Sequence, residues 1–170
     1  DRDHVRGNPH ASVALLEYGD YECPYCGQAH PMVAHLEAEF GDELRFAFRH
    51  FPLAQLHPHA RSAAAAAEAA GLQGAFWEMH DTLYTHQNAL DHDHLLAYAH
   101  ALTLDLDQFV TDMASQRVHE RIQEDFLFGV RSGVNGTPTF FINGERHDHW
   151  YDIDALRYAI NQSLRTVGAR

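Results

Sequence analysis

The segment Cys23-Pro24-Tyr25-Cys26 constrains the fold of this chain more than any other feature. It follows a short apolar run at residues 13–16, which is typical of a buried strand, and a few residues that favour a turn. Pro24 suits the first position of a helix, and apolar side chains then recur at helical spacing until Gly41 predicts the helix end. The pattern predicts a strand, a turn and a helix with Cys23 at its amino end.

The spacing of the two cysteines favours redox chemistry over a structural disulfide. They are the only cysteines in the 170 residues. Closing a loop of about four residues removes roughly 2 kcal/mol of unfolded-state entropy, against nearly 5 kcal/mol for a loop of about 100 residues. The pair would therefore stabilise the fold only weakly, whereas two thiols at this spacing can form and open a disulfide without a change of fold.

The two cysteines are expected to act differently. Free N–H groups and the macrodipole at the amino end of a helix stabilise an anion by about 0.3–1 kcal/mol, and by about 2 kcal/mol when partly buried. Cys23 should therefore be an exposed nucleophile with a lowered pKa, and Cys26, further into the helix, should be less exposed and resolve the mixed disulfide. Asp20 and Glu22 lie close in sequence and oppose the ionisation of Cys23, so we expect its pKa to be lowered only moderately.

The rest of the chain alternates between strand and helix patterns. Apolar and polar residues alternate over residues 44–51, which predicts a strand with one buried face, and Asn143-Gly144 predicts the turn of a hairpin that extends to His149. Residues 1–10 have the composition of a linker. Helices are predicted at about residues 58–70, 74–87, 92–102, 105–115 and 117–132, with Asp91 and Asp105 as caps and Gly133 as a stop, and a last helix starts at Asp152 or Asp154.

This pattern resembles the thioredoxin superfamily, and specifically its DsbA-like branch. The resemblance rests on the strand at residues 12–18, the Cys23-Pro24-Tyr25-Cys26 segment, Pro31, and Gly136-Thr137-Pro138-Thr139 before a strand. It implies an α/β fold, a thioredoxin fold with a helical insertion, as one DsbA-like domain over residues 1–170. The thioredoxin core would comprise about residues 11–56 and 134–168, and the helical insertion about residues 57–133.

The resemblance also assigns roles to individual residues. In this family the proline that matches Pro138 is cis and lies against the disulfide, and the proline that matches Pro31 bends the helix. A cis bond before Pro138 would let Thr137 and Pro138 hold the backbone of an extended peptide. Glu17 matches a buried acid that moves a proton at the second cysteine. Two alternatives stay open: Thr137-Pro138 could form an ordinary turn before an edge strand, and Glu17 could face water near the end of its strand.

Composition excludes several other classes of function. A hydrophobic content of 45% in 170 residues is enough for a buried core. The formal net charge is −12 and the chain has no lysine, which argues against a nucleic-acid partner, because such binding depends on clustered Lys and Arg. No apolar run reaches the roughly 18 residues of a membrane-spanning helix, so we expect no membrane insertion of this segment.

The chain contains fifteen histidines, which raises the question of a metal site. Three pairs at alternate positions are candidate ligands, namely His57/His59, His92/His94 and His147/His149. Zinc usually takes four convergent ligands, and this spacing alone does not bring ligands together. We therefore predict no metal and no cofactor beyond the redox-active disulfide Cys23–Cys26, and we expect His50 to be a structural residue near the core.

The function predicted from these features is thiol:disulfide oxidoreductase activity, in which the CxxC pair exchanges disulfides with protein or peptide thiols, including a redox partner protein. Strongly oxidising relatives carry histidine where this chain has Tyr25, so the direction of electron flow stays open. The motif segments also resemble DsbA-like domains found alone or fused behind sodium/proton antiporters. The alternative function is therefore a redox-sensing regulatory module of a membrane transporter, within a longer membrane-fused chain.

A third hypothesis, a glutathione-dependent transferase or isomerase, fits less well because such relatives often replace the first cysteine by serine, and Cys23 is retained. The sequence does not fix the compartment. A domain fused to an antiporter would favour the cytoplasm, whereas removal of a leader before Asp1 would place the chain in the periplasm or outside the cell.

Overall fold

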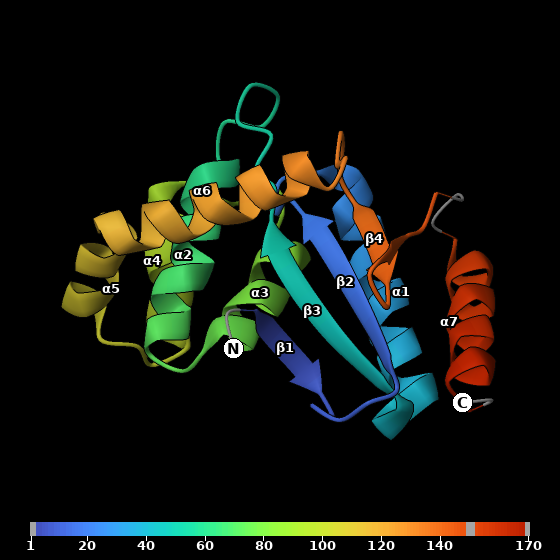
Figure 1. Cartoon of the computed structure of the whole chain (residues 1–170). Helices are drawn as coiled ribbons and strands as arrows, with labels where there is room; N and C mark the ends of the chain where they lie inside the picture. Colours follow the sequence, from blue (N-terminus) through green and yellow to red (C-terminus); the bar gives the residue numbers. More distant parts are fainter. Residues whose placement is uncertain (1–2, 149–151, 169–170) are drawn as a thin grey trace.

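In the computed structural model, which describes residues 3–148 and 152–168, one five-stranded sheet has the strand order β1-β3-β2-β4-β5 (Figure 1). The strands are β1 (His4–Gly7), β2 (Val13–Gly19), β3 (Leu44–His50), β4 (Thr139–Ile142) and β5 (Glu145–Arg146). Only β2 and β3 are parallel, with Gly19 opposite His50, and the other neighbouring pairs are antiparallel. The carboxyl ends of β2 and β3 therefore meet at one edge, where the CxxC segment begins.

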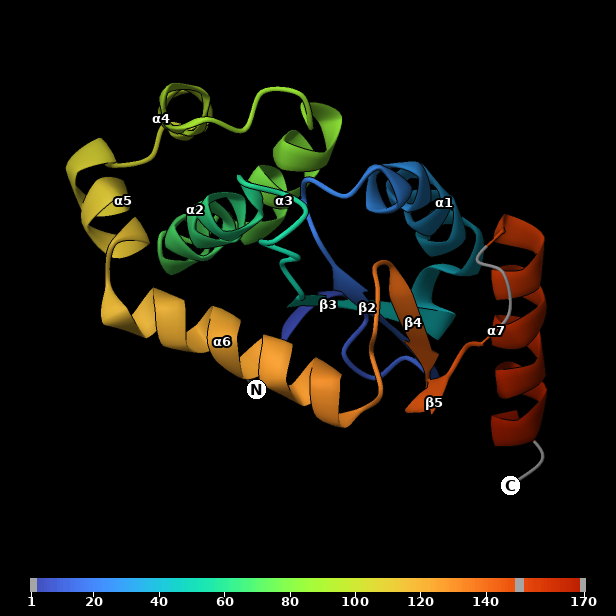
Figure 2. The same ribbon diagram turned by 90° about the horizontal axis from the view of Figure 1, so that it is seen from above.

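Helices cover both faces of the sheet. The first helix, α1 (Pro24–Phe40), and the last, α7 (Ile153–Gly168), contact each other, and their apolar side chains pack with those of Val13 and Leu15. On the opposite face, Tyr18 and Leu16 pack with Phe126 of α6 (Gln116–Arg131). Figure 2 shows α1 and α6 on opposite sides of the sheet. Because alternate strand residues face opposite sides, Glu17 faces the same side as Leu15, toward α1.

Four further helices lie between β3 and α6 and form a group at one end of the molecule (Figure 2). The predicted helices are confirmed, and Asp91 and Asp105 cap two of them by accepting hydrogen bonds from His94 N and Gln108 N. Gly133 adopts a φ of 81° just after α6. None of the described helices is both long and apolar enough to cross a membrane. The bounds are α2 (Ala60–Leu72), α3 (Phe76–Thr85), α4 (His92–Ala101) and α5 (Leu106–Met113), with a short 3-10 helix at Gly41–Glu43 before β3.

The alanine run in α2 forms the centre of this helical group. Residues 63–67 are all buried, and α2 contacts α3, α5 and α6. Alanine has the highest helix propensity, and its small side chain allows neighbouring helices to approach closely. The alanine run therefore packs against neighbouring helices on several sides of α2.

The prediction of a linker over residues 1–10 is wrong for its central part. Residues 4–7 form β1, which pairs with the outer edge of β3 so that His4 lies opposite Phe48 and Gly7 opposite Arg45. The strand has no clear signal in the sequence, because the alternation of half-buried and exposed residues covers only four positions. Pairing with β1 provides hydrogen-bond partners for backbone N–H and C=O groups at the edge of β3 that would otherwise have none in the sheet.

The predicted hairpin is confirmed around its turn, where Asn143 and Gly144 both have positive φ, of 49° and 85°. This is the conformation for which Asn-Gly is favoured in two-residue hairpin loops. Strand β5 is shorter than predicted, since it comprises only Glu145–Arg146. The predicted strand end, His149, lies outside the described residues.

Gly129 of α6 provides a test of how α6 packs on the sheet. A Cβ atom there would lie 2.7 Å from Phe51 Cδ2 and 3.0 Å from Tyr18 Cε1. Glycine to alanine normally stabilises a helix by about 0.5–1 kcal/mol, but overpacking a core costs about 1–3 kcal/mol. We expect Gly129→Ala to lower the free energy of unfolding by about 1–2 kcal/mol in urea titrations. Gly168→Ala, where no atom lies within 4 Å of the added carbon, should cause no loss.

Candidate active site

The end of β2 and the start of α1 position Cys23. It is the N-cap residue of α1, and Pro24 occupies the first helical position. The N–H of Cys23 donates to Asp20 O at 3.1 Å, and its carbonyl accepts from Gly27 N at 3.1 Å. The turn between strand and helix is thus fixed by backbone bonds, and Cys23 lies where free helical N–H groups favour an anion.

Cys23 is less accessible than the sequence predicted. It is only 3% exposed, and its sulfur lies 3.4 Å from Thr137 O in the loop before β4, a contact in which the protonated thiol is the donor. A hydrogen bond from Cys26, followed by donors on Thr137 and the backbone N–H groups of Cys26 and Tyr25, lowers the pKa of Cys23 to about 5, although burial acts in the opposite direction. This lowering of the pKa is larger than a helix terminus alone provides. Because the pKa lies below 7, Cys23 is a thiolate at neutral pH.

Cys26 lies directly behind it. This residue is fully buried, and its sulfur accepts a hydrogen bond from Asp20 N at 3.5 Å. Burial, together with the hydrogen bond to Cys23, raises the pKa of Cys26 well above its ordinary value. Both cysteines are free thiols in this structure. The pair therefore combines one easily ionised sulfur with one that holds its proton.

The loop before β4 brings a third element to the cysteines. The Thr137–Pro138 peptide bond is cis, and the Thr139 hydroxyl donates to Gly136 O at 2.8 Å. The Thr137 hydroxyl oxygen is buried without a hydrogen-bond partner, so it is available to a thiolate at Cys23. Pro31, the other proline of the sequence pattern, lies within α1.

Glu17 is buried beneath the cysteines and does not face water. The residue is 2% exposed, and its Oε1 atom has no hydrogen-bond partner. Burial, and to a smaller extent the charge of Cys23, raises the pKa of Glu17 to about 8. The side chain therefore carries a proton at neutral pH within electrostatic reach of both cysteines, because its charge also contributes to the raised pKa of Cys26.

Asp20 and Glu22, expected to oppose the ionisation of Cys23, are instead paired with the loop after β3. Asp20 accepts from Leu53 N at 2.9 Å and contacts His57 Nδ1 at 2.8 Å. Glu22 accepts from His59 N at 2.6 Å and contacts the Nδ1 atom of the same residue at 3.0 Å. His57 and His59 thus pair with separate carboxylates and fasten this loop beside the CxxC segment.

The other histidines singled out from the sequence have different surroundings. His50 is buried, and its Nε2 atom lies 2.8 Å from Glu68 Oε1. His94 pairs with Asp91 at 2.6 Å in the cap of α4. The backbone N–H of His147 donates to Phe140 O, and its predicted pair member His149 lies outside the described residues.

Gln87 is a site residue that no sequence motif indicates. Its amide nitrogen donates to Tyr21 O at 2.8 Å and to Cys23 O at 2.9 Å. It comes from the segment after α3, 64 residues from Cys23, and no motif marks it. The side chain of Gln87 therefore links the turn that contains Cys23 to the segment that follows α3.

Replacing Gln87 by methionine, which has a similar length and no donor, should lower the free energy of unfolding by about 2 kcal/mol, because two partly buried hydrogen bonds are lost. Urea titration measures the change. Gln73 also makes two hydrogen bonds, to the backbone of Asp105, but they are exposed. Gln73→Met should therefore cost less than half as much, and equal losses in the two variants would contradict a specific role for Gln87.

Comparisons with known proteins agree with this architecture. A family model described as thioredoxin matches residues 1–162. The chain is 53% identical over 164 residues to a Na(+)/H(+) antiporter, NhaA 1 of Salinispora arenicola, covering 96% of this chain and 25% of the antiporter. The chain thus spans about a quarter of the length of the curated relatives it matches.

Two solved structures are similar over nearly their whole length. A thioredoxin-like oxidoreductase from Silicibacter pomeroyi has a TM-score of 0.86 and 28% identity, over 96% of this chain and 93% of that one. Wolbachia pipientis alpha-DsbA1 has a TM-score of 0.84 and 19% identity, over 98% and 93%. The predicted fold class, an α/β thioredoxin fold of DsbA-like type, is confirmed.

Proposed function

The chain belongs to the thioredoxin family, and from that premise we propose that it is a thiol-disulfide oxidoreductase that exchanges disulfides with protein or peptide dithiols. The single observation that carries the proposal is the difference between the two sulfurs. The pKa of Cys23 is lowered to about 5, whereas the pKa of Cys26 is raised well above its ordinary value. Such a pair supplies one attacking or leaving thiolate and one protonated resolving thiol.

The reaction runs through a mixed disulfide. Starting from the Cys23–Cys26 disulfide, a substrate thiolate attacks Cys23 Sγ, and the bond to Cys26 breaks with its electron pair on Cys26, which takes up a proton. A second substrate thiolate then attacks the substrate sulfur bound to Cys23, so that a substrate disulfide forms and Cys23 leaves as a thiolate. The substrate is oxidised by two electrons and the protein is reduced by two. Glu17 is the proposed source of the proton, because it is buried and protonated near Cys26.

The low pKa of Cys23 favours this oxidising direction. A low-pKa thiolate is the better leaving group, and its stability lowers the free energy of the reduced protein. At pH 7, a pKa of about 5 stabilises the thiolate by ~2.3 kcal/mol more than the pKa of about 7 typical of thioredoxin. For a two-electron couple this corresponds to ~50 mV, so we expect a potential ~50 mV above the −270 mV of thioredoxin.

We propose that Thr137 and Pro138 hold an extended peptide beside Cys23. A cavity of about 260 Å³ borders these two residues and is also lined by Arg146 and His147. The carbonyl of Thr137 lies 3.4 Å from the sulfur that would carry the mixed disulfide. A peptide strand bound there would place its own cysteine against Cys23.

We further propose that the chain forms one domain, with a thioredoxin core at about residues 11–56 and 134–168 and a helical insertion at about residues 57–133. One continuous cluster of buried side chains supports this. It includes Leu15 of β2, Ala66 of α2, Met79 of α3 and Leu156 of α7. The helices between β3 and β4 thus share the core of the sheet and do not form a separate one.

A second candidate function follows from the antiporter relatives. Because this chain matches about a quarter of their length, the same cysteine pair could act as a redox sensor that regulates a membrane transporter. A sensor needs only one oxidation and one reduction for each change of state. An enzyme needs repeated cycles, so the number of turnovers separates the two.

The test is to incubate the purified chain with an excess of a dithiol peptide and glutathione disulfide, with Cys23→Ser as the control. We expect many disulfides formed per protein molecule and none above background in the variant. A stoichiometric oxidation that stops after one turnover, with a change in conformation, would favour the sensor. Equal activity in the protein and in Cys23→Ser would contradict both functions.

A further inference from the structure

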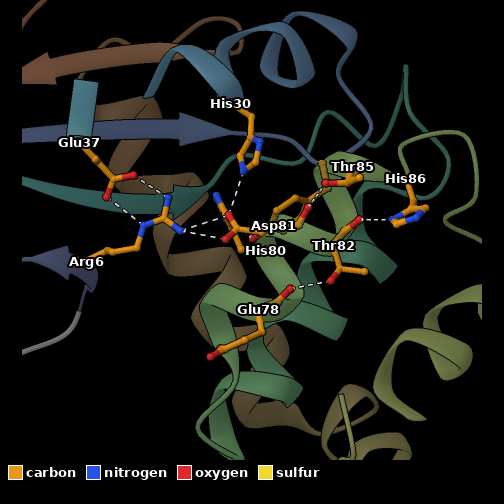
Figure 3. Close-up of polar contacts among 10 residues, drawn as sticks. Arg6, His30, Glu37, Glu78, His80, Asp81, Thr82, Thr85 and His86 are labelled. Atoms are coloured by element: carbon orange, nitrogen blue, oxygen red, sulfur yellow. Dashed lines mark hydrogen bonds and ion pairs between the residues drawn. The ribbon is translucent and has the colours of Figure 1, made fainter. Parts of the chain in front are cut away.

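Three side chains with metal-binding groups meet where α1 passes α3. They are His30 of α1 and the adjacent His80 and Asp81 of α3. One ligand atom from each lies within 4.8 Å of the other two, and His30 Nε2 lies 2.9 Å from Asp81 Oδ1. Figure 3 shows His30 pointing from its helix toward Asp81. Neither the proposed disulfide exchange nor its mechanism uses this group.

The donor set and the spacing suit zinc. Two imidazoles and a carboxylate, with a fourth position left for water, are typical of open zinc sites. Zinc–nitrogen distances of about 2.0–2.1 Å separate neighbouring tetrahedral ligand atoms by roughly 3.3 Å. The 2.9 Å between His30 and Asp81 is close to this value, so small side-chain rotations would admit the ion.

The surroundings support His80 as a ligand. It is 1% exposed and packs among the rings of Phe48 and Phe76, and burial favours the neutral imidazole that metals bind. Its Nδ1 atom lies 3.0 Å from the hydroxyl of Tyr21. An outer partner of this kind fixes the ring of a metal-binding histidine.

The charges around the group leave room for a cation. Arg6 donates to both carboxylate oxygens of Asp81, at 3.2 Å and 3.1 Å, but its guanidinium is also bound by both carboxylate oxygens of Glu37, at 2.9 Å and 2.7 Å (Figure 3). One guanidinium and two carboxylates sum to a single negative charge. The side chain of Asp81 is 47% exposed, so an ion can enter from solvent.

The described residues contain one other group of this kind, formed by His4, His50 and Glu68. It is less suitable. Both imidazoles already lie 2.8 Å from the same Oε1 atom of Glu68, whose side chain is only 8% exposed. Arg121, which also pairs with Asp125 at 3.2 Å, lies 3.7 Å from that same oxygen, so this single carboxylate oxygen already has three cationic or imidazole neighbours.

We propose that His30, His80 and Asp81 form a Zn²⁺ site that ties the active-site helix α1 to α3. The bound ion would lie four residues beyond Cys26 along α1, and it would contact the turn before Cys23 through the Tyr21–His80 pair. The site is independent of the proposed catalytic activity, so each can fail without the other.

The test is a zinc titration of the full chain in its disulfide form, in which neither cysteine can bind the metal, read by competition with a chromophoric chelator. We expect one equivalent bound, and an affinity at least tenfold lower in His30→Gln and in Asp81→Asn, a loss typical even of outer partners. His35→Gln is the matched control, because His35 lies on the same helix with its side chain 62% exposed, and it should leave the affinity unchanged.

Cobalt provides a second readout. With Co²⁺ in place of zinc, the protein should show visible bands of a tetrahedral site and no thiolate charge-transfer band. Zinc should also raise the melting temperature of the protein but not that of His30→Gln. Binding no tighter in the protein than in His30→Gln would overturn the proposal, as would an affinity that falls in His4→Gln and is unchanged in His30→Gln.

Discussion

Replacing Cys23 by serine is expected to lower the rate of dithiol oxidation at least a thousandfold, to the background rate, whereas Cys26→Ser, in which no Cys23–Cys26 disulfide can form, is expected to trap a mixed disulfide when it reacts with a substrate disulfide. A serine at position 23 cannot form a bond to the substrate sulfur. With Cys26 replaced, Cys23 still attacks a substrate disulfide, and the covalent product has no resolving thiol. Intact-protein mass spectrometry and turnover assays distinguish the two outcomes.

The chain offers a clean background for this comparison, since it has no cysteine outside the pair. Any adduct must therefore be on the cysteine that remains. The roles assigned here require that Cys26→Ser accumulate the adduct and that Cys23→Ser form it slowly, because the pKa of Cys26 is raised by burial. Faster adduct formation in Cys23→Ser than in Cys26→Ser would show that Cys26 is the nucleophile and Cys23 the resolving residue.

Glu17→Gln is expected to slow the step in which Cys26 gains or loses its proton by about a hundredfold, within the range of general acid–base catalysis. Glutamine keeps the size of the side chain and removes the proton that the buried acid exchanges. Rapid-mixing experiments with a substrate disulfide measure this step, because Cys26 then loses its proton as it attacks the mixed disulfide on Cys23. The initial attack by Cys23 should change much less, and equal losses in both steps would argue against proton transfer.

The same variant should also change how stability depends on pH. The pKa of Glu17 is raised from 4.5 to about 8 in the folded protein, so its contribution to stability is fully present below pH ~4.5 and is lost as pH rises to about 8. The slope reaches at most ~1.4 kcal/mol per pH unit. Glu17→Gln should remove this slope of the free energy of unfolding against pH. Glu43→Gln, which replaces an exposed glutamate, should retain it.

These measurements should use the disulfide form. In the reduced protein, the pKa of Cys23 is lowered to about 5 in the folded state, so its contribution to stability is present above the unfolded pKa and is lost as pH falls through about 5. The two groups therefore act in opposite directions between about pH 5 and 8. A slope in the oxidised protein that survives Glu17→Gln would have another origin.

Local signals in the sequence predicted most of the elements. Asp91 and Asp105 cap helices where expected because an N-cap acts on backbone groups two or three residues away. Asn143-Gly144 predicted its turn for the same reason, as both residues tolerate positive φ. The position of Cys23 at the start of α1 followed from Pro24 and the helical spacing of apolar residues.

Long-range contacts explain what the sequence could not predict. Cys23 is buried by Thr137, a residue 114 positions away, so its low exposure has no local signal. The amide of Gln87 reaches Cys23 O across 64 positions and carries no motif. Pairing with His57 and His59 turned Asp20 and Glu22 from expected opponents of ionisation into anchors of a loop. Such pairs form only when the whole chain has folded.

The most direct test is a titration of the Cys23 thiol, followed by its ultraviolet thiolate absorbance in the reduced protein, with Cys23→Ser to identify the signal. The donors around the sulfur predict a transition at a pKa of about 5 that is absent from the variant. A transition near the ordinary thiol pKa of about 8.5 would contradict the central claim, because Cys23 would then be neither a ready nucleophile nor a good leaving group at neutral pH.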